Sequence, residues 1–451
     1  MRDSLKTVLS SLWLLVAALS IAGIPCRLAL AAPDDHIFAD GFEASLLLQV
    51  TNAGGGSVTS DTGGIDCGAT CSAMFQDGSL VTLQARTTNG SGYSFTGWSG
   101  DCAGSFHDCT LTMSTARSVT ATFTNQPFNL AFVSSATFAT TLGSAGAYDA
   151  QCNILATNAG INNVAGNAYV AWVSSFTTTA AARLGTARGW VRLDGAPFAD
   201  DANSLLTANK VFNAIDRDEA GASVIAQPVL TGTQSGGSLS AGTCSGWTST
   251  SGSYGAGDSS GGPIAWTFRS YANCTQAARI DCLMNTLAAT LSPTLNAGRK
   301  IWITSAAFLP GSATTPDQAC NADRPSGVAS AKAVIATATS PAVDALSLAD
   351  TYVRPDGQIV GTGAELASTE IRTGIWQTAS GTYLDATATG TWTGDASDLT
   401  TTGTAGGTCT SWTSSIGNAG FGIPTVSDAR WWNTAQRACT STSTRLICAE
   451  Q

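Results

Sequence analysis

The chain is poor in charged side chains and almost lacks histidine. Only 12% of its residues are charged, against about 25% in typical globular proteins. Its two histidines are His36 and His107. Histidine often serves as a general acid or base at neutral pH and is a common zinc ligand. The composition therefore argues against histidine-dependent catalysis and against a histidine-rich zinc site.

An excess of positive charge is also missing. The sequence has 21 basic and 31 acidic side chains, which gives a formal net charge of −10. A surface of this sign repels phosphate backbones and heparin-like polyanions. We therefore expect no nucleic-acid partner, whereas a divalent cation or a neutral glycan remains compatible with the charge.

Long apolar runs are absent except near the start of the sequence. Arg2 and Lys6 precede an apolar stretch over residues 8–25, and Ala29-Leu30-Ala31 follows with the small-x-small pattern that signal peptidases cut. We predict a signal peptide over residues 1–31 and a secreted or cell-surface protein with no stable membrane span in its mature chain. A membrane anchor or a lipid-modified cysteine is the alternative interpretation of this segment.

Cysteine, by contrast, is plentiful. Of the 13 cysteines, all but Cys26 lie beyond the predicted signal peptide, which leaves an even number. In an oxidising compartment an even count indicates a disulfide framework, so six bridges are expected. Zinc is a competing interpretation for Cys67 and Cys71, but it would need a second ligand pair.

Eight of the cysteines form a repeat. Cys152, Cys244, Cys274 and Cys282 are separated by 92, 30 and 8 positions, and Cys320, Cys409, Cys439 and Cys448 by 89, 30 and 9. The surrounding residues agree, since CSGWTS at 244–249 matches CTSWTS at 409–414. We therefore predict two tandem copies, copy one over residues 129–286 and copy two over residues 300–451, joined by a linker over 287–299. Spacing alone leaves three connectivities in each copy.

The segment before the repeats has the pattern of a small all-β module. A short acidic leader over residues 32–44 precedes it. Apolar residues then alternate with polar ones at Leu46–Val50, Val81–Ala85 and Val119–Phe123, and glycine clusters separate these runs. Alternation of this kind is typical of half-buried strands, so residues 45–125 are expected to form a β-sheet domain.

This β-module resembles the divergent internalin B-type repeat of bacterial surface and secreted proteins. The resemblance rests on the order of its glycines and cysteines and on FTGWSG at residues 95–100. It implies a spacer or adhesive unit without a known catalytic role. We expect Trp98 to pack in the core, and we prefer the local disulfides Cys67–Cys71 and Cys102–Cys109.

Each copy is predicted to be α+β, with a helix that carries its first cysteine. In copy one, Cys152, Leu155, Ala156 and Ala159 follow helical spacing, and Gly160 stands ready to end the helix. In copy two, Thr315 is placed as an N-cap, with Pro316 at the first helical position and Gln318 completing a capping box. Short strands and glycine-rich loops fill the rest of each copy.

A first cysteine on a helix and a last cysteine near the end, with a second pair between them, resembles the C-type-lectin-like fold and most closely its endostatin-like branch. The matching segments include WVRLDG at 190–195, CSGW at 244–247 and WWN at 431–433. The resemblance implies nested pairing: Cys152–Cys282, Cys244–Cys274, Cys320–Cys448 and Cys409–Cys439. The expected fold class is thus multidomain and disulfide-rich, with a small all-β module followed by two α+β C-type-lectin-like modules.

The departures from that resemblance limit what it implies about function. Calcium-dependent sugar binding in this fold typically uses Glu-Pro-Asn or Gln-Pro-Asp, and Gln227-Pro228-Val229 lacks the third oxygen-bearing residue. Neither copy contains the histidine that the endostatin zinc site uses. Neither activity can be transferred to this chain.

Acidic loops in copy one are the strongest local candidates for a site. Asp194, Asp216, Asp218 and Glu219 have the oxygen ligands that calcium prefers, so calcium is the one possible cofactor. The alternative is that these residues are ordinary solvated loop carboxylates. Copy two places Trp376, Thr378 and Ala379 opposite the last three acids, so it would not share such a site.

The expected function is adhesion to an extracellular protein or glycan, and the expected alternative is a structural cell-envelope protein. Gly257–Gly262 is similar to the loop of a serine-protease nucleophile, but neither copy supplies the histidine of a triad. We expect no enzyme, with a carboxylate-based hydrolase as a remote alternative. Trp247 and Trp412 are predicted to be core residues. The ligand and the oligomeric state stay open.

Overall fold

The computed structural model describes residues 45–87, 93–104, 108–125, 127–159, 161, 168–384 and 390–451. The predicted signal peptide, the acidic leader, His107 and Gly160 lie outside the described residues. The described chain is multidomain and mostly β, with few helices and six disulfides. In this part of the chain, every helix is too short or too polar to cross a membrane.

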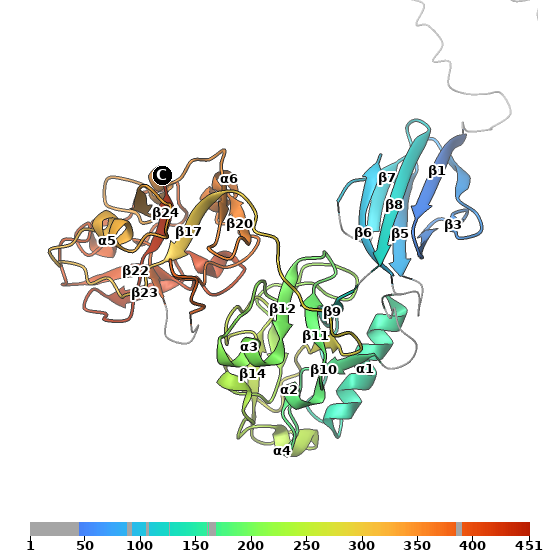
Figure 1. Cartoon of the computed structure of the whole chain (residues 1–451), viewed down its shortest axis with the longest axis horizontal. Helices are drawn as coiled ribbons and strands as arrows, with labels where there is room; N and C mark the ends of the chain where they lie inside the picture. Colours follow the sequence, from blue (N-terminus) through green and yellow to red (C-terminus); the bar gives the residue numbers. More distant parts are fainter. Residues whose placement is uncertain are drawn as a thin grey trace, which may run out of the picture. The chain divides into compact units, whose positions relative to one another are not determined.

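The β-module consists of two four-stranded sheets (Figure 1). One sheet has the order β4 (Ser72–Gln76), β1 (Ser45–Ala53), β8 (Arg117–Asn125) and β6 (Tyr93–Gly100). The other has the order β3 (Asp66–Cys67), β2 (Gly56–Ser60), β5 (Leu80–Thr87) and β7 (Asp108–Thr112). The predicted alternation is confirmed, because Leu83 on β5 and Val119 on β8 are fully buried. Trp98 is also buried, with its ring centroid 5.1 Å from that of Phe95.

The two copies share one strand order, as the repeat predicted. The five-stranded sheet of copy one runs β10 (Tyr169–Ala171), β16 (Asp281–Met284), β9 (Asn129–Val133), β11 (Arg188–Val191), β12 (Pro197–Asp201). Its counterpart in copy two runs β18 (Ala331–Ala333), β24 (Ile447–Glu450), β17 (Arg299–Ile303), β19 (Thr351–Val353), β20 (Ile359–Thr362). In both sheets the central strand is antiparallel to the strand that carries the last cysteine and parallel to its other neighbour.

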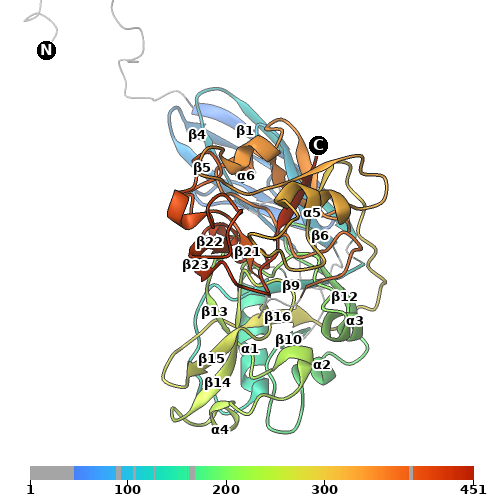
Figure 2. The ribbon, with the colours of Figure 1, turned by 90° about the vertical axis from the view of Figure 1, so that its left-hand side faces the viewer.

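A smaller, three-stranded sheet accompanies each large one. In copy one it consists of β13 (Pro228–Leu230), β14 (Ser253–Asp258) and β15 (Ser270–Asn273), which lie side by side in Figure 2. In copy two it consists of β21 (Thr391–Trp392), β22 (Asn418–Gly422) and β23 (Ala435–Ala438). Because the order is the same in both copies, aligned residues occupy equivalent places in the fold.

Helices are short apart from the one that carries the first cysteine of copy one. Copy one has α1 (Ala145–Asn158), α2 (Ala180–Arg183), α3 (Ala202–Thr207), η1 (Ser235–Gly237) and α4 (Cys244–Trp247). Copy two has α5 (Pro316–Ala322), η2 (Ala342–Ala345), α6 (Gly363–Ala367), η3 (Ala405–Gly407) and η4 (Ala429–Trp431). The predicted capping box is present, because the Thr315 hydroxyl accepts from the Gln318 backbone and the Gln318 side chain accepts from the Thr315 backbone.

All six disulfides join the predicted cysteines. Two are local bridges in the β-module, Cys67–Cys71 and Cys102–Cys109. The four others are nested in the copies as the resemblance implied: Cys152–Cys282, Cys244–Cys274, Cys320–Cys448 and Cys409–Cys439. Each outer bridge fastens the first helix of a copy to its large sheet across about 130 residues of sequence. Closing a loop of this length removes much of the entropy of the unfolded chain.

The two indoles that follow the inner disulfides are buried, as predicted. Trp247 Nε1 donates to the Ser174 carbonyl at 2.8 Å, and Trp412 Nε1 donates to the Ala336 carbonyl at 2.9 Å. Both tryptophans have positive φ, 71° and 70°, a region that costs non-glycine residues of order 1–3 kcal/mol. The strain recurs at the same place in both copies because the disulfide and the buried ring hold the backbone there.

The copies contact each other directly, within a compact unit that covers residues 46–451. Gly261 and Val426, which align when Trp266 is matched with Trp431, form an antiparallel bridge. Its two hydrogen bonds run in opposite senses: Gly262 N donates to Thr425 O, and Ser427 N donates to Ser260 O, both at 2.8 Å. Equivalent loops of the two copies therefore pair with each other, as in an isologous dimer.

Candidate functional site

The four acids that were predicted as calcium ligands are held by other groups of the protein. Asp194 makes a bidentate ion pair with Arg192, in which Nη2 lies 2.6 Å from Oδ2 and Nε lies 3.1 Å from Oδ1. Burial opposes ionisation of Asp194, but the charge and hydrogen bonds of Arg192 outweigh it and lower the pKa of the carboxyl. The Ala196 amide donates to the same carboxylate.

Asp216 lies on the other side of the same guanidinium. Its Oδ1 accepts from Arg192 Nη1 at 2.6 Å, and its Oδ2 accepts from the hydroxyl of Ser427 in copy two at 2.9 Å. Burial alone would lower the pKa of Arg192, but the carboxylates of Asp216 and Asp194 outweigh it and raise that pKa. Arg192 is therefore a permanent buried cation with two matched anions.

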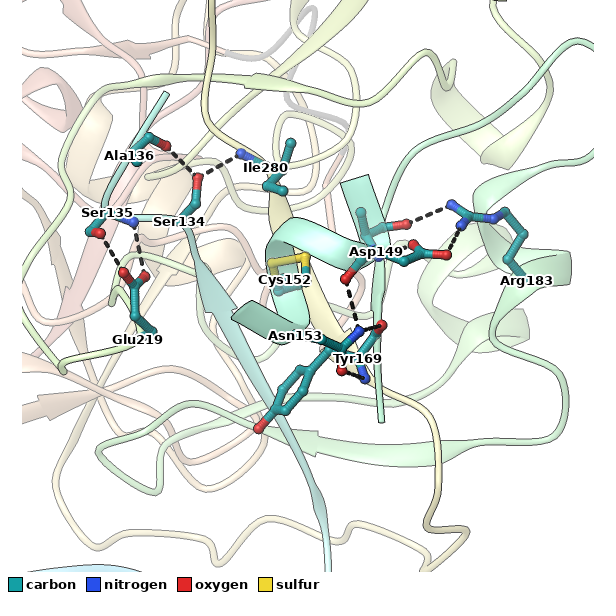
Figure 3. Close-up of a disulfide and its surroundings, with 12 residues drawn as sticks. Ser134, Ser135, Ala136, Asp149, Cys152, Asn153, Tyr169, Arg183, Glu219 and Ile280 are labelled. Carbon is teal, nitrogen blue, oxygen red and sulfur yellow. Dashed lines mark hydrogen bonds and ion pairs between the residues drawn. A yellow bond between two sulfur atoms is a disulfide. The ribbon is translucent and has the colours of Figure 1, made fainter. Parts of the chain in front are cut away.

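Asp218 and Glu219 stabilise loops instead of facing a common point with the other acids. Asp218 Oδ1 accepts from the amides of Ala220 and Ala222, which closes a tight turn. Glu219 accepts from both the amide and the hydroxyl of Ser135, as Figure 3 shows. Because both acids are buried, the alternative of solvated loop carboxylates is wrong for them and for Asp216.

A calcium site therefore gains no support from this geometry. Within the described ranges, no three or more His, Cys, Asp or Glu side chains are grouped so that they could hold a metal ion. Calcium needs six to eight oxygens that are free to replace its water. The oxygens of Asp194 and Asp216 are instead shared with arginine side chains.

Copy two buries an equivalent arginine, Arg354, and its guanidinium has partly different partners. Arg354 pairs with Asp356 at 2.8 Å, as Arg192 pairs with Asp194. Where copy one has Asp216, copy two has Trp376, and the guanidinium carbon of Arg354 lies 4.4 Å from the centroid of that ring. Arg354 also donates to the carbonyl of Phe212 in copy one. One cation is thus met by a second carboxylate and the other by an aromatic face.

A polar groove runs along the contact between the copies, with a volume of about 740 Å³. We call it the inter-copy groove. Its lining includes the following residues of copy one: Arg192, Asp194, Pro197, Asn213 and Arg217. From copy two and the linker come Asn296, Gln358, Ile359, Ile371 and Arg372. The groove therefore exists only because the two copies contact each other.

Arginine and amide side chains line the groove, and most of their N–H groups and charges are paired within the protein. Asn213 Nδ2 donates to Gln358 Oε1 at 2.9 Å and so ties the two walls together. Arg217 Nη1 lies 3.4 Å from Asp216 Oδ1, and Arg217 Nε lies 3.7 Å from Asp194 Oδ2. This Nε is buried and has no hydrogen-bond partner among the described residues. Ile359 and Ile371 add an apolar strip. Such a mixture suits a polar, hydroxyl-rich ligand.

Sequence reasoning identified the acids of this region but not the groove. The sequence did contain a sign that Asp194 is part of an ion pair, because Arg192 and Asp194 belong to a segment that matches Arg354 and Asp356 in copy two. An arginine two residues before an aspartate in both copies indicates a structural ion pair. That Arg217 and Gln358 line one groove depends on contact between the copies, which no local pattern shows.

The fold and the disulfides define this chain as a multidomain, disulfide-bonded protein that is consistent with an extracellular location. Its first domain matches the family model of the divergent InlB B-repeat domain over residues 46–127, in agreement with the resemblance inferred from the sequence. No curated protein matches the chain.

Proposed function

We propose that this chain is a secreted or cell-surface binding protein that recognises a glycan through the inter-copy groove. Six disulfides and the match to the InlB B-repeat support an extracellular role. The nested disulfides and the helix-borne first cysteines support the finer assignment of both copies as C-type-lectin-like, endostatin-like modules.

The observation that carries this proposal is the chemistry of the groove. Arginine and amide donors line it, and Asp194 and Asp216 balance much of the positive charge. Sugar hydroxyls accept hydrogen bonds without bringing net charge, so a neutral glycan fits better than a polyanion.

The test is a glycan array probed with the full chain and two variants. Arg217→Gln replaces the groove arginine by the residue that copy two carries at the aligned position, Gln377, and should abolish or strongly weaken binding. Arg86→Gln removes one half-buried arginine from the β-module and should leave binding unchanged. Glycan binding that survives Arg217→Gln would overturn the groove as the site. A chain that binds nothing on the array would instead favour a structural envelope protein.

A further inference from the structure

In copy one, a carboxylate and two backbone carbonyls hold the guanidinium of Arg183 near the outer disulfide (Figure 3), and we call these three acceptors the cradle. Its Nη1 donates to the carbonyls of Ala171 at 3.0 Å and Val173 at 2.8 Å, and its Nη2 pairs with Asp149 Oδ2. The other oxygen of Asp149 accepts from the Ala171 amide at 2.8 Å, which fixes the carboxylate. A carboxylate and two carbonyls thus surround one planar cation.

Copy two keeps the framework of this cradle. Asp317 Oδ1 accepts from the Ala333 amide at 2.9 Å, as Asp149 does from Ala171. Asn321 bonds to Asp317 O and to Ala331, as Asn153 bonds to Asp149 O and Tyr169. The register is fixed because Ala171 pairs with Cys282 and Ala333 pairs with Cys448.

The cation that fills the cradle is missing from the corresponding place in copy two. An alignment of the two copies that starts at Ala171 and Ala333 and has no gap places Ala345 opposite Arg183. The same alignment places Arg354 opposite Arg192. Among the described residues, no side chain donates to the second oxygen of Asp317. Copy two therefore keeps the carboxylate of the cradle, and Ala333 and Ile335 stand at the positions whose carbonyls accept from Arg183 in copy one. It lacks the built-in donor.

A pocket of about 510 Å³ lies where that cation would be, and we call it the copy-two pocket. Its lining includes Asp317, Lys332, Ala333, Ile335, Asp344 and Ala345. The lining contains two carboxylates and one ammonium, so its net charge favours a cation. Lys332 makes no ion pair within 4 Å with any acid that the structure describes, and its place on β18 is exposed.

We propose that the copy-two pocket binds the guanidinium of an arginine supplied from outside the copy. The cradle of copy one shows how these acceptors hold such a group, with the carboxylate on one edge and the two carbonyls on the other. A guanidinium has a planar fork of donors that matches this arrangement, whereas an ammonium is a point charge. The copy-two pocket shares no lining residue with the inter-copy groove, so this proposal and the glycan proposal can fail independently.

The experiment is calorimetric titration of the full chain with acetyl-Gly-Arg-Gly-amide. We expect the arginine peptide to bind at one site. The peptide with lysine in place of arginine should bind at least about tenfold more weakly, and the peptide with the uncharged isostere citrulline should not bind. Asp317→Asn should abolish the site, and Asp77→Asn, an exposed turn residue of the β-module, should not change it. Tighter binding of the peptide than of free L-arginine would identify a polypeptide as the source, and the reverse would identify the free amino acid.

A second variant tests the same comparison in copy one, by removing the arginine that occupies the cradle there. Arg183→Ala empties the cradle of copy one and should raise the stoichiometry for the arginine peptide from one to two. If the variant is destabilised, millimolar guanidinium at concentrations below those that denature should restore part of its melting temperature, and Arg86→Ala should show no such rescue. Binding of the citrulline peptide as tight as that of the arginine peptide, or full binding by Asp317→Asn, would overturn the proposal.

Discussion

Copy one and copy two differ most where they bury charge. Their large sheets have one strand order and their disulfides one pattern. Yet the partner of a buried arginine is Asp216 in one and Trp376 in the other. Both copies pair the buried arginine with an aspartate two positions later, and they differ in a second contact of the guanidinium, which is a carboxylate in copy one and an aromatic face in copy two.

A second difference concerns a carboxyl in the core. Asp281 on β16 of copy one aligns with Ile447 on β24 of copy two, next to the last cysteine of each copy. Alternate residues of a strand share a face, so Asp281 lies on the same face as Leu283, which belongs to a hydrophobic cluster. Its Oδ1 has no hydrogen-bond partner among the described residues, and burial raises its pKa well above the ordinary value.

The largest expected effect tests what the copies share. Trp247→Ala and Trp412→Ala each remove a buried indole and its hydrogen bond, so each should lower the free energy of unfolding by about 3–5 kcal/mol. Chemical denaturation of the full chain, followed by fluorescence and by calorimetry, measures both. A cost confined to one of the two variants would show that the copies do not use this position alike. Lost ligand binding with unchanged stability would make the rings a recognition surface instead.

The next effect concerns the cation that the copies balance differently. Asp216→Asn leaves Arg192 buried with one carboxylate and should cost about 3 kcal/mol of stability. The corresponding change in copy two, Trp376→Phe, keeps an aromatic face over Arg354 but removes the hydrogen bond from Trp376 Nε1 to the Val211 carbonyl, which is worth about 1 kcal/mol. We expect it to cost less in total than Asp216→Asn. Equal costs in urea denaturation would mean that the second carboxylate contributes no more than the ring and its hydrogen bond together.

A smaller effect is expected at the buried carboxyl, and it has the opposite sign. Asp281→Asn should stabilise the chain at neutral pH by about 1–3 kcal/mol, because the ionised form no longer has to be avoided in the core. With the folded pKa raised, the contribution of Asp281 is complete below the ordinary pKa of 3.8 and is lost as the pH rises through the folded pKa. The variant should lose this pH dependence.

The control for the carboxyl is the reverse substitution in copy two. Ile447→Asp should introduce a decline in melting temperature between acidic and neutral pH that the wild-type residue does not cause. If Asp281→Asn leaves the pH profile of stability unchanged, the carboxyl of Asp281 titrates normally and the contrast between the copies at this position disappears.

The smallest expected effect concerns calcium. Because Asp194 and Asp216 are paired with Arg192, and Asp218 and Glu219 accept from amides and a hydroxyl, we expect no calcium-dependent change in melting temperature. Melting the full chain in millimolar calcium and in chelator measures it, since a ligand of the native state adds to stability. A clear stabilisation that Asp216→Asn removes would restore the calcium hypothesis.

The amino-acid sequence determined those features that depend on neighbours or on regular spacing. The alternation in β5 and β8, the capping box at Thr315 and the six cysteine pairs follow from local pattern, repeat and resemblance. The acidic loops were visible too, but not their role. A list of carboxylates states how much negative charge is present, and it does not state which cation lies opposite.

Only the tertiary structure decided how those charges are used. Asp216 is separated from Arg192 by 24 positions and from Ser427 by 211, so its partners come together only when both copies fold and contact each other. The same holds for the counterpart of the Arg183 cradle, where Ala345 stands at the aligned position and lines a pocket. Burial makes each unpaired charge costly, and whether a charge is paired depends on side chains that are distant in sequence.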